Sequence, residues 1–473
     1  MRILLAAAAA VSATLFSTPP LLAQTAAPSG DAGLVARGAY LAKAADCAAC
    51  HRAELADGKP YVGGYAIASP MGNIIAPNIT PSKTAGIGQW SFADFDRAMR
   101  KGERPDGGKL YPAMPYTDYQ GISDADMHAL YAYFMQGVQP VDTVTPKTHL
   151  PFPFNLRVIM APWNWLFRSN KPFTAASGLD PQAQRGQYLV ETLGHCGSCH
   201  TPRNLLMAEE SAKALSGADV AGWHAPNITS DPISGVGGWS QPEIVDYLRN
   251  GHVTGKGVAA GGMGEAVENS LRYLTQPDLA AIAAYLKASK PVRDPAETKP
   301  AFAWTQVRPV PLSAYETGDS HDQAALAKSD TTDGALLYAN GCASCHGLDG
   351  KGTKDGFYPP LLGSSTTGAA NPANLVMTIL NGVDREGADS HSFMPRFATQ
   401  MNDDQVAAVA NHVLATFGRP DRKVTAAMVA DARHGGGKPL LLTLMPWLFG
   451  LGALVLVAIA YLGLRRPRRR QVA

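Results

Sequence analysis

The sequence predicts an all-α protein in which three small domains follow one another and a transmembrane helix closes the chain. Three observations on the 473 residues carry this prediction. The motif Cys-x-x-Cys-His occurs three times, a long segment recurs at a fixed offset, and the stretch 440–464 has no charged side chain. We place the three domains at 31–142, 180–292 and 330–418 and call them the first, second and third units.

The first 23 residues have the pattern of a signal peptide. Arg2 is followed by an apolar run from Ile3 to Phe16 and by small residues near Ala23 that suit signal peptidase. An N-terminal membrane anchor is the alternative, but about 14 apolar residues are too few to cross a bilayer comfortably. We therefore expect residues 1–23 to be removed and the mature chain to begin near Gln24.

An internal repeat defines the first two units. The segment APNITPSKTAGIGQWS returns as APNITSDPISGVGGWS 149 residues later, and the same offset relates Met114 to Met263 and the first cysteines of the two motifs. Self-similarity at a fixed offset indicates that both units follow one plan. The third unit is a shorter version, with 52 residues from its first cysteine to Met394 where the other units have 67.

Each unit is expected to begin and end with a helix. RGAYLAKAADC and RGQYLVETLGHC have apolar residues at helical spacing and lead directly into the cysteines. DMHALYAYFM, DLAAIAAYLK and DDQVAAVANHVLATF have the same spacing near the end of each unit. Proline-rich connectors, roughly 143–179 and 293–333, separate the units. The aromatic stretch APWNWLFR in the first connector either packs on its own domains or meets a partner subunit or a membrane surface.

The stretch 440–464 predicts a helix that crosses a membrane once. At about 1.5 Å per residue, 25 residues exceed the roughly 30 Å thickness of the hydrocarbon core. Five arginines follow in the last nine residues. Positively charged flanks stay in the cytoplasm, so this pattern predicts an inner-membrane protein with all three units on the periplasmic side. A buried core helix is the alternative.

The charge balance gives no indication of nucleic-acid binding. The formal net charge is +2, from 41 Lys and Arg against 39 Asp and Glu. Six of the basic residues are Arg2 and the five arginines of the tail, which leaves 35 basic against 39 acidic residues between the two apolar ends. The units themselves are therefore slightly acidic, and we expect no nucleic-acid partner.

All six cysteines lie in the repeated motif, which predicts covalently attached haem c. On one helical turn, residues i, i+3 and i+4 share a face, so two thiols can bond the vinyl groups of one haem while the histidine faces its iron. A zinc site needs four ligands, so two motifs would have to meet and the third would be left over. A redox Cys-x-x-Cys needs no histidine after it. We expect three haems, each attached by two cysteines and bound by one histidine: Cys47, Cys50 and His51; Cys196, Cys199 and His200; Cys342, Cys345 and His346.

Methionines downstream of each motif are the candidates for the sixth iron ligand. A thioether sulfur favours ferrous iron and raises the reduction potential. Met114 in YPAMPY and Met263 in GGMGEA lie at identical distances from their cysteines. Met394 in SFMPRF has a similar setting, with Met401 and Met377 as rivals. Three six-coordinate irons would leave no open position for a substrate, so the predicted role is electron transfer and no catalytic residue is assigned.

Taken together, these motifs resemble the tri-haem cytochrome c subunits of membrane-bound periplasmic dehydrogenases. The resemblance lies in RGAYLAKAADCAACH, NITPSKTAGIG, LYPAMPY, HCGSCHTPRN and a third CASCH unit, and it covers nearly the whole mature chain. Within that family, PKTHLPFPF, DGKGTKDGFYPPLLG and NGVDR look most like the cytochrome subunits of flavin-dependent fructose dehydrogenases.

The resemblance implies a heterotrimer. A flavoprotein large subunit would oxidise the substrate with the help of a small subunit, and this chain would pass the electrons through its haems to ubiquinone. Related cytochromes serve gluconate, sorbitol, alcohol and aldehyde dehydrogenases, which are the alternatives for the partner. A terminal oxidase is the alternative acceptor. A peroxidase-like haem enzyme and a membrane anchor with redox-silent haems are the alternatives of another class.

Overall fold

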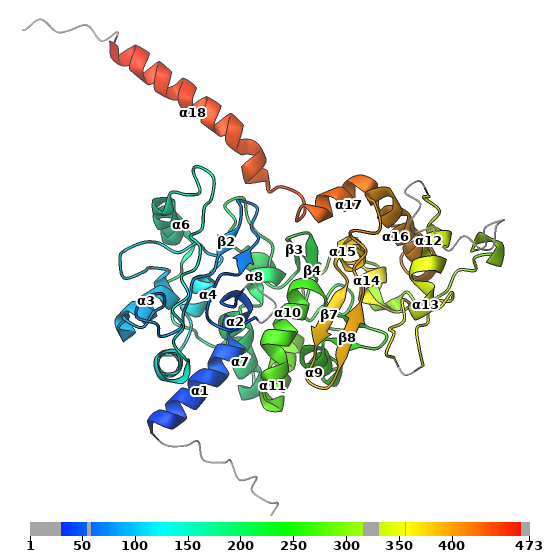
Figure 1. Cartoon of the computed structure of the whole chain (residues 1–473), viewed down its shortest axis with the longest axis horizontal. Helices are drawn as coiled ribbons and strands as arrows, with labels where there is room; N and C mark the ends of the chain where they lie inside the picture. The colour runs from blue at the N-terminus through cyan, green and yellow to red at the C-terminus, as the bar shows by residue number, and fades with distance from the viewer. Residues whose placement is uncertain (1–29, 54–57, 316–330, 355, 465–473) are drawn as a thin grey trace, which may run out of the picture.

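The structure, a computed structural model, describes residues 30–53, 58–315, 331–354 and 356–464. Figure 1 shows the first unit in blue and cyan beside the second in green, with the third in yellow and orange on the far side of the second. The predicted signal peptide, 1–23, lies outside the described residues.

In the first unit, a long opening helix packs against the helix that closes the unit. Asp31 occupies the first turn of the opening helix, where a carboxylate is favourable. Ser91 caps a later helix through a capping box with Asp94. The elements are α1 (Asp31–Ala44), α2 (Cys47–Cys50), β1 (Ala66–Ile67), β2 (Ile74–Ile75), α3 (Phe92–Lys101), α4 (Tyr116–Tyr119) and α5 (Asp124–Ala132), which a π-helical turn, Tyr133–Gly137, extends.

The second unit repeats this plan after the first connector, which forms α6 (Met160–Phe167). Asp180 and Pro181 start its opening helix as cap and first residue, and Ser240 caps a later helix. The elements are α7 (Pro181–Tyr188), α8 (Gly197–His200), β3 (Ala218–Val220), β4 (Trp223–Ala225), α9 (Gln241–Asn250), β5 (His252–Val253), β6 (Gly257–Val258), α10 (Gly261–Asn269) and α11 (Gln276–Ala288).

The third unit is smaller, and it is followed by two further helices. Its closing helix begins at Asn402, which forms a capping box with Gln405. The elements of the unit are α12 (Gly334–Gly341), α13 (Ala343–His346), α14 (Ser365–Gly368), α15 (Ala373–Asn381), β7 (Val383–Glu386), β8 (His391–Met394) and α16 (Asp403–Phe417). The helices after it are α17 (Ala426–Arg433) and α18 (Leu440–Leu464).

One glycine in each unit lets the opening and closing helices touch backbone to backbone. A Cβ at that position would lie 1.9 to 2.3 Å from a carbonyl oxygen of the closing helix, which is far closer than van der Waals contact. The pairs are Gly38 with Ala129 at 1.9 Å, Gly186 with Ala281 at 1.9 Å, and Gly334 with Ala408 at 2.3 Å. This crossing sets the distance between the two ends of each unit, and with it the position of the cysteine turn that follows the opening helix.

The apolar core is divided unevenly among the units. A single cluster of buried residues runs through the first and second units and includes Leu41, Leu130, Leu193 and Leu279. The third unit has its own cluster, against which Trp223 of the second unit packs. The first two units therefore share one continuous core, and the third has a separate core.

The prediction of an all-α fold is corrected by four two-stranded antiparallel sheets, β1–β2, β3–β4, β5–β6 and β7–β8. The first two hairpins precede the APNIT segments, the third precedes α10, and the fourth carries Met394. Each strand has only two to four residues. Such strands are too short for an alternating polar and apolar pattern to be visible in the sequence.

The predicted transmembrane helix, and with it the predicted single C-terminal pass through the inner membrane, is also corrected. Within the described parts of the chain, no helix combines the length and the apolar character that crossing a membrane requires. The prediction rested on the length of the uncharged stretch 440–464 and on the arginines after it; α18 does form over this stretch, with Pro446 inside it.

The aromatic stretch of the first connector packs on the protein itself along one side. Asn164 in α6 is buried and accepts a hydrogen bond from Tyr116 Oη at 2.7 Å. Trp163 Nε1 donates to the carbonyl oxygen of Leu206 in the second unit at 2.9 Å. The neighbouring Trp165 is 82% exposed. The connector thus bridges the first two units and leaves one large aromatic side chain at the surface.

Candidate functional site

Each Cys-x-x-Cys-His motif folds into a single helical turn. In all three, the backbone N–H of the histidine donates to the carbonyl oxygen of the first cysteine, which closes the turn and puts both thiols and the imidazole on one side. The pairs are His51 with Cys47 at 3.0 Å, His200 with Cys196 at 2.9 Å, and His346 with Cys342 at 2.9 Å. All six cysteines are free thiols. The structure thus brings together the three side chains of each motif as the spacing predicts.

Each of these histidines is oriented by the carbonyl oxygen of a proline. His51 Nδ1 lies 2.8 Å from Pro77 O, His200 Nδ1 lies 2.7 Å from Pro226 O, and His346 Nδ1 lies 3.0 Å from Pro359 O. A carbonyl oxygen can only accept, so Nδ1 is the protonated nitrogen in all three rings. The lone pair of Nε2 is consequently the one available to a metal, and the hydrogen bond fixes the ring and raises its basicity.

Burial favours the neutral forms of the three motif histidines and of most of the motif cysteines. Desolvation lowers the pKa of His51, His200 and His346, although the proline carbonyls act in the opposite direction. Burial also raises the pKa of the thiols of Cys47, Cys50, Cys196 and Cys342 to about 12. A neutral imidazole is the ligating form of histidine. Thiols held in the protonated state are poorly suited to zinc binding or to disulfide exchange, both of which need the thiolate.

A glycine at positive φ joins each histidine to its proline. Its N–H donates to the carbonyl oxygen of the histidine, and a Cβ on it would lie within about 3 Å of the backbone at the proline. These glycines are Gly63 (φ +70°), Gly217 (φ +94°) and Gly352 (φ +65°). A side chain would be strained at this φ and would push the proline segment away. The three units therefore share one local arrangement, which consists of a cysteine turn, a glycine and a proline carbonyl.

The three predicted methionines lie in different kinds of backbone, although all are partly buried. Met114 is in the turn before α4, Met263 is in α10, and Met394 is in β8, opposite Val383. Met114 and Met263 pack against the shared core of the first two units.

The two rivals of Met394 have core positions. Met377 in α15 and Met401 are buried, with 6% and 3% of their surface exposed, inside the apolar cluster of the third unit. Asn381 Nδ2 is also 3.8 Å from the sulfur of Met377. Packing accounts for both side chains, whereas Met394 is partly buried and does not belong to that cluster.

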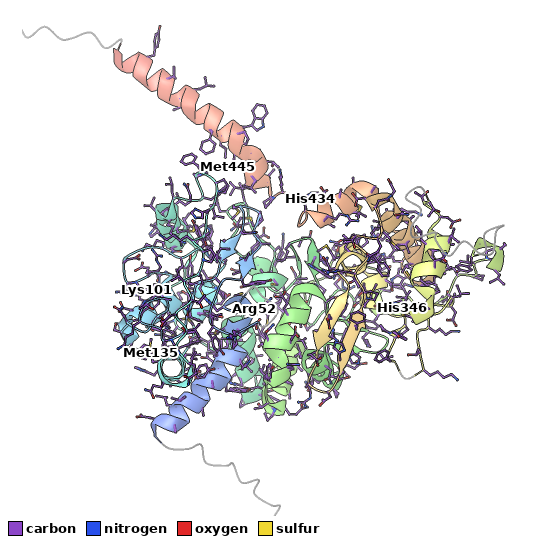
Figure 2. The ribbon with its side chains drawn as sticks, viewed as in Figure 1. Arg52, Lys101, Met135, His346, His434 and Met445 are labelled. Carbon is purple, nitrogen blue, oxygen red and sulfur yellow. The ribbon has the colours of Figure 1, made fainter. Side chains whose placement is uncertain are left out.

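The helix that carries Met263 lies between the other two predicted sites. It packs against α2 of the first unit and β7 of the third. Beside His51, Arg52 Nη2 pairs with Glu265 Oε2 at 3.3 Å, and Tyr65 Oη donates to Glu265 Oε1 at 3.4 Å. In Figure 2, Arg52 lies near the middle of the protein and His346 in the third unit on the right. The second unit thus contacts the cysteine turn of the first unit and, in the third unit, the β7–β8 hairpin, which carries Met394.

The proline carbonyls are functional groups that the sequence analysis missed. We expected the APNIT segments to wall the haem pockets as scaffold, without identifying the carbonyl oxygens of their prolines as partners of the histidines. The signal was present, because Pro77 and Pro226 both lie 26 residues after the motif histidine. It could not be extended to the third unit, where the distance to Pro359 is 13 residues and no APNIT precedes it.

The observed residues fit haem c. Each turn offers two unpaired thiols and an imidazole whose orientation and tautomer are set by the backbone around it; the imidazole is buried at His200 and half-buried at His51 and His346. This donor set suits covalent attachment through the thiols and iron binding through Nε2.

Comparison with known proteins agrees with this geometry. The pattern of the Cytochrome c family matches residues 35–137 and 331–416. The chain is 44% identical over 450 residues to the fructose dehydrogenase cytochrome subunit of Gluconobacter japonicus, covering 92% of both chains. It is 39% identical over 429 residues to the alcohol dehydrogenase (quinone) cytochrome c subunit of Gluconacetobacter polyoxogenes, covering 88% of this chain and 87% of that one. It is also 39% identical over 413 residues to the gluconate 2-dehydrogenase cytochrome c subunit of Pantoea cypripedii, covering 85% and 89%.

These similarities confirm the resemblance that the motifs indicated, and the family implies covalently bound haem c. The relatives share the whole succession of units and not one domain alone, since each is covered over 87% or more of its own length. The chain therefore belongs to the cytochrome c subunits of dehydrogenases, which transfer electrons and are not themselves the catalytic dehydrogenase.

Proposed function

We propose that this chain accepts electrons from a dehydrogenase subunit and delivers them to ubiquinone by means of three covalently bound haems c. The proposed number of haems rests on one observation. The same arrangement of cysteine turn, glycine and proline carbonyl occurs around His51, His200 and His346. The proposed domains are the three units as the sequence divides them, 31–142, 180–292 and 330–418.

The residues of each unit have separate tasks in this proposal. Two cysteines hold the haem covalently, the histidine is one axial ligand through Nε2, and Met114, Met263 or Met394 is the other. Bound haem c supplies a one-electron couple at its iron, whose potential depends on axial ligand, burial and hydrogen bonding. The proline carbonyls orient the histidines, and the apolar clusters exclude water from the sites. Support for Met394 comes from the core positions of its rivals.

The proposed partner is a flavin-dependent dehydrogenase of the fructose type, made of a large and a small subunit that form a heterotrimer with this chain. Its support is the 44% identity to a fructose dehydrogenase cytochrome subunit, against 39% for the alcohol and gluconate dehydrogenase subunits. Gluconate and alcohol dehydrogenases are the alternative partners.

The haem count and the axial ligands can be tested on the purified full chain. A pyridine haemochrome assay together with an iron-to-protein ratio should give three haems per chain, and a ratio of two would contradict the proposal. Met114→Leu, Met263→Leu and Met394→Leu should each convert one haem to a high-spin form with a lower potential. Met377→Leu and Met401→Leu are the matched controls and should leave all haems low-spin. A resting high-spin iron in the unaltered protein would instead favour a peroxidase-like enzyme.

The partner is tested by purifying the native complex through a tag on this chain. Bound flavin, and reduction of the haem bands by fructose, would support the fructose-type assignment. Reduction only by gluconate or an alcohol would move the chain to another dehydrogenase. Substrate-dependent reduction of a ubiquinone analogue by the complex tests the acceptor, and reduction of the haems without any reduction of quinone would contradict it.

A further inference from the structure

A cleft between the first unit and the first connector gathers positive charge. It has a volume of about 600 Å³ and lies between the end of α3, the segment 120–124 and the connector residues 168–173. Asp124 is the one carboxylate among the described residues of its lining, whereas four cations line it: Arg100, Lys101, Arg168 and Lys171. The chain between its two apolar ends is slightly acidic. This basic cleft therefore departs from the overall charge balance.

Three of the four cations have no counter-ion in the part of the chain that the structure describes. Arg100 is neutralised, since it pairs with Asp96 at 2.7 Å and with Asp124 at 2.8 Å. Arg168 is half-buried, and its Nε has no hydrogen-bond partner. No carboxylate oxygen of a described residue lies within 4.0 Å of the charged groups of Lys101, Arg168 and Lys171. Unpaired cations around a concave site raise the positive potential inside it, which attracts anionic groups.

Hydrogen bonds and ring packing fix the walls of the basic cleft. The N–H of Asn170 donates to Gln120 Oε1 at 3.0 Å, which ties the connector to the first unit. The N–H of Ser123 donates to Tyr188 Oη at 3.2 Å. The ring of Phe173 packs edge to face on that of Tyr188, with centroids 5.3 Å apart, and gives the cleft an aromatic wall. A site that is already formed loses little conformational entropy when a partner binds.

The size and the mixed lining of the cleft indicate which anion fits. A free phosphate ion would fill only a small part of this volume and would not use the aromatic wall. An acidic peptide segment can pair its carboxylates with the cations and pack its other side chains on the rings. Resting on the proposed function, we propose that the basic cleft receives an acidic segment of the dehydrogenase subunit that supplies the electrons. Figure 2 shows Lys101 at the edge of the first unit that faces away from His346, so the dehydrogenase would cover this side of the protein.

The test is the affinity of the dehydrogenase for this chain, measured by mass photometry as the purified native complex is diluted. Lys101→Gln with Lys171→Gln removes two exposed cations. An exposed ion pair contributes up to about fivefold in affinity, so this double variant should bind about tenfold more weakly at low salt. Its dissociation constant should also depend less on salt, because fewer charge pairs are left to screen. Lys147→Gln with Lys290→Gln, which removes two exposed cations outside the cleft, is the matched control and should leave the affinity unchanged.

Further measurements make the test decisive. Lys171→Glu should weaken the complex more than Lys171→Gln does, because it sets a carboxylate against the acidic segment. Unchanged affinity in the double variant and in Lys171→Glu would overturn the inference and leave the proposed function intact. Loss of binding to phosphatidylglycerol vesicles, with the dehydrogenase retained, would overturn it in favour of an anionic lipid surface. Absence of any dehydrogenase from the complex purified through the unaltered chain would overturn the proposed function itself.

Discussion

The crossing of α7 and α11 in the second unit has no room for a methyl group at position 186. A Cβ there would lie 1.9 Å from the carbonyl oxygen of Ala281 and 2.8 Å from Cβ of Tyr285. The first of these contacts involves backbone, which cannot rotate away as a flexible side chain would. An ordinary contact between such atoms is about 3.5 Å. Gly186→Ala must therefore push the two helices apart by more than about 1 Å.

Two opposing effects set the size of the change. Overpacking a tight contact typically costs about 1 to 3 kcal/mol. Replacing glycine by alanine inside a helix gains up to about 1 kcal/mol of helix propensity. Because the clash is with backbone, the cost lies in the upper part of its range, about 2 to 3 kcal/mol, and the net destabilisation is about 1 to 2 kcal/mol. Because the first two units share one core, they should unfold together as a body of roughly 250 residues, for which 1 kcal/mol shifts Tm by about 2 to 4 °C.

Thermal unfolding of the holoprotein, followed by circular dichroism, should therefore show the main transition lowered by about 2 to 8 °C in Gly186→Ala. Gly450→Ala makes the same change in α18, where nothing lies within 4 Å of the added Cβ, and should leave this transition in place. An unchanged or higher Tm in Gly186→Ala would refute the view that backbone contact at the helix crossing holds the unit together.

Three further predictions concern other parts of the protein. Burial, and secondarily the neighbouring Glu209, raises the pKa of Asp118 from 3.8 to about 8. Between these two pH values the folded state retains a proton that the unfolded state releases, so the stability of the folded state falls as pH rises. Asp118→Asn should therefore raise Tm above that of the unaltered protein by more at pH 7.5 than at pH 4.5. Burial lowers the pKa of His412 below 6.5, opposed by Asp333. The unfolded state then binds the proton first as pH falls, so the third unit loses stability below about pH 6.5, and His412→Phe should reduce that loss. Ser240→Ala removes the cap of α9, which should cost about 1 kcal/mol and lower the main Tm by about 2 to 4 °C.

Each of these predictions has a contrary outcome in the same melting experiments. A parallel pH profile for Asp118→Asn and the unaltered protein would show that the carboxyl is ionised in the folded state. Equal acid sensitivity with and without His412 would show that the imidazole is hydrated. Ser211→Ala, at an exposed position, is the control for Ser240→Ala, and equal effects of the two would argue against the cap.

Local patterns predicted the parts of the structure that depend on near neighbours in sequence. The Cys-x-x-Cys-His motifs form the expected turns because i, i+3 and i+4 adjacency is a property of any helix. The apolar spacing in DLAAIAAYLK and DDQVAAVANHVLATF predicted helices where α11 and α16 occur. The assignment of the axial methionines and the division into units rest on the same repeat and stay predictions.

The missed features depend on contacts between segments that are distant in sequence. Arg385 reads as an ordinary polar residue, but β7 packs against α10 and the guanidinium donates a hydrogen bond to the carbonyl oxygen of Ala259, 126 residues away. The shared core of the first two units could not be predicted from the repeat. A repeat indicates that two units are similar, but it does not show how they pack against each other.

The glycine and the proline that orient each histidine are separated by loops of different length. The span is 14 residues from Gly63 to Pro77, 9 from Gly217 to Pro226 and only 7 from Gly352 to Pro359. The longer spans contain β1–β2 and β3–β4, and β3–β4 is attached to the third unit by paired hydrogen bonds between His224 and Asn374, both of 2.8 Å. Units of this kind can thus differ in the contacts they make with their neighbours at one fixed place, while the residues that orient each histidine keep their arrangement.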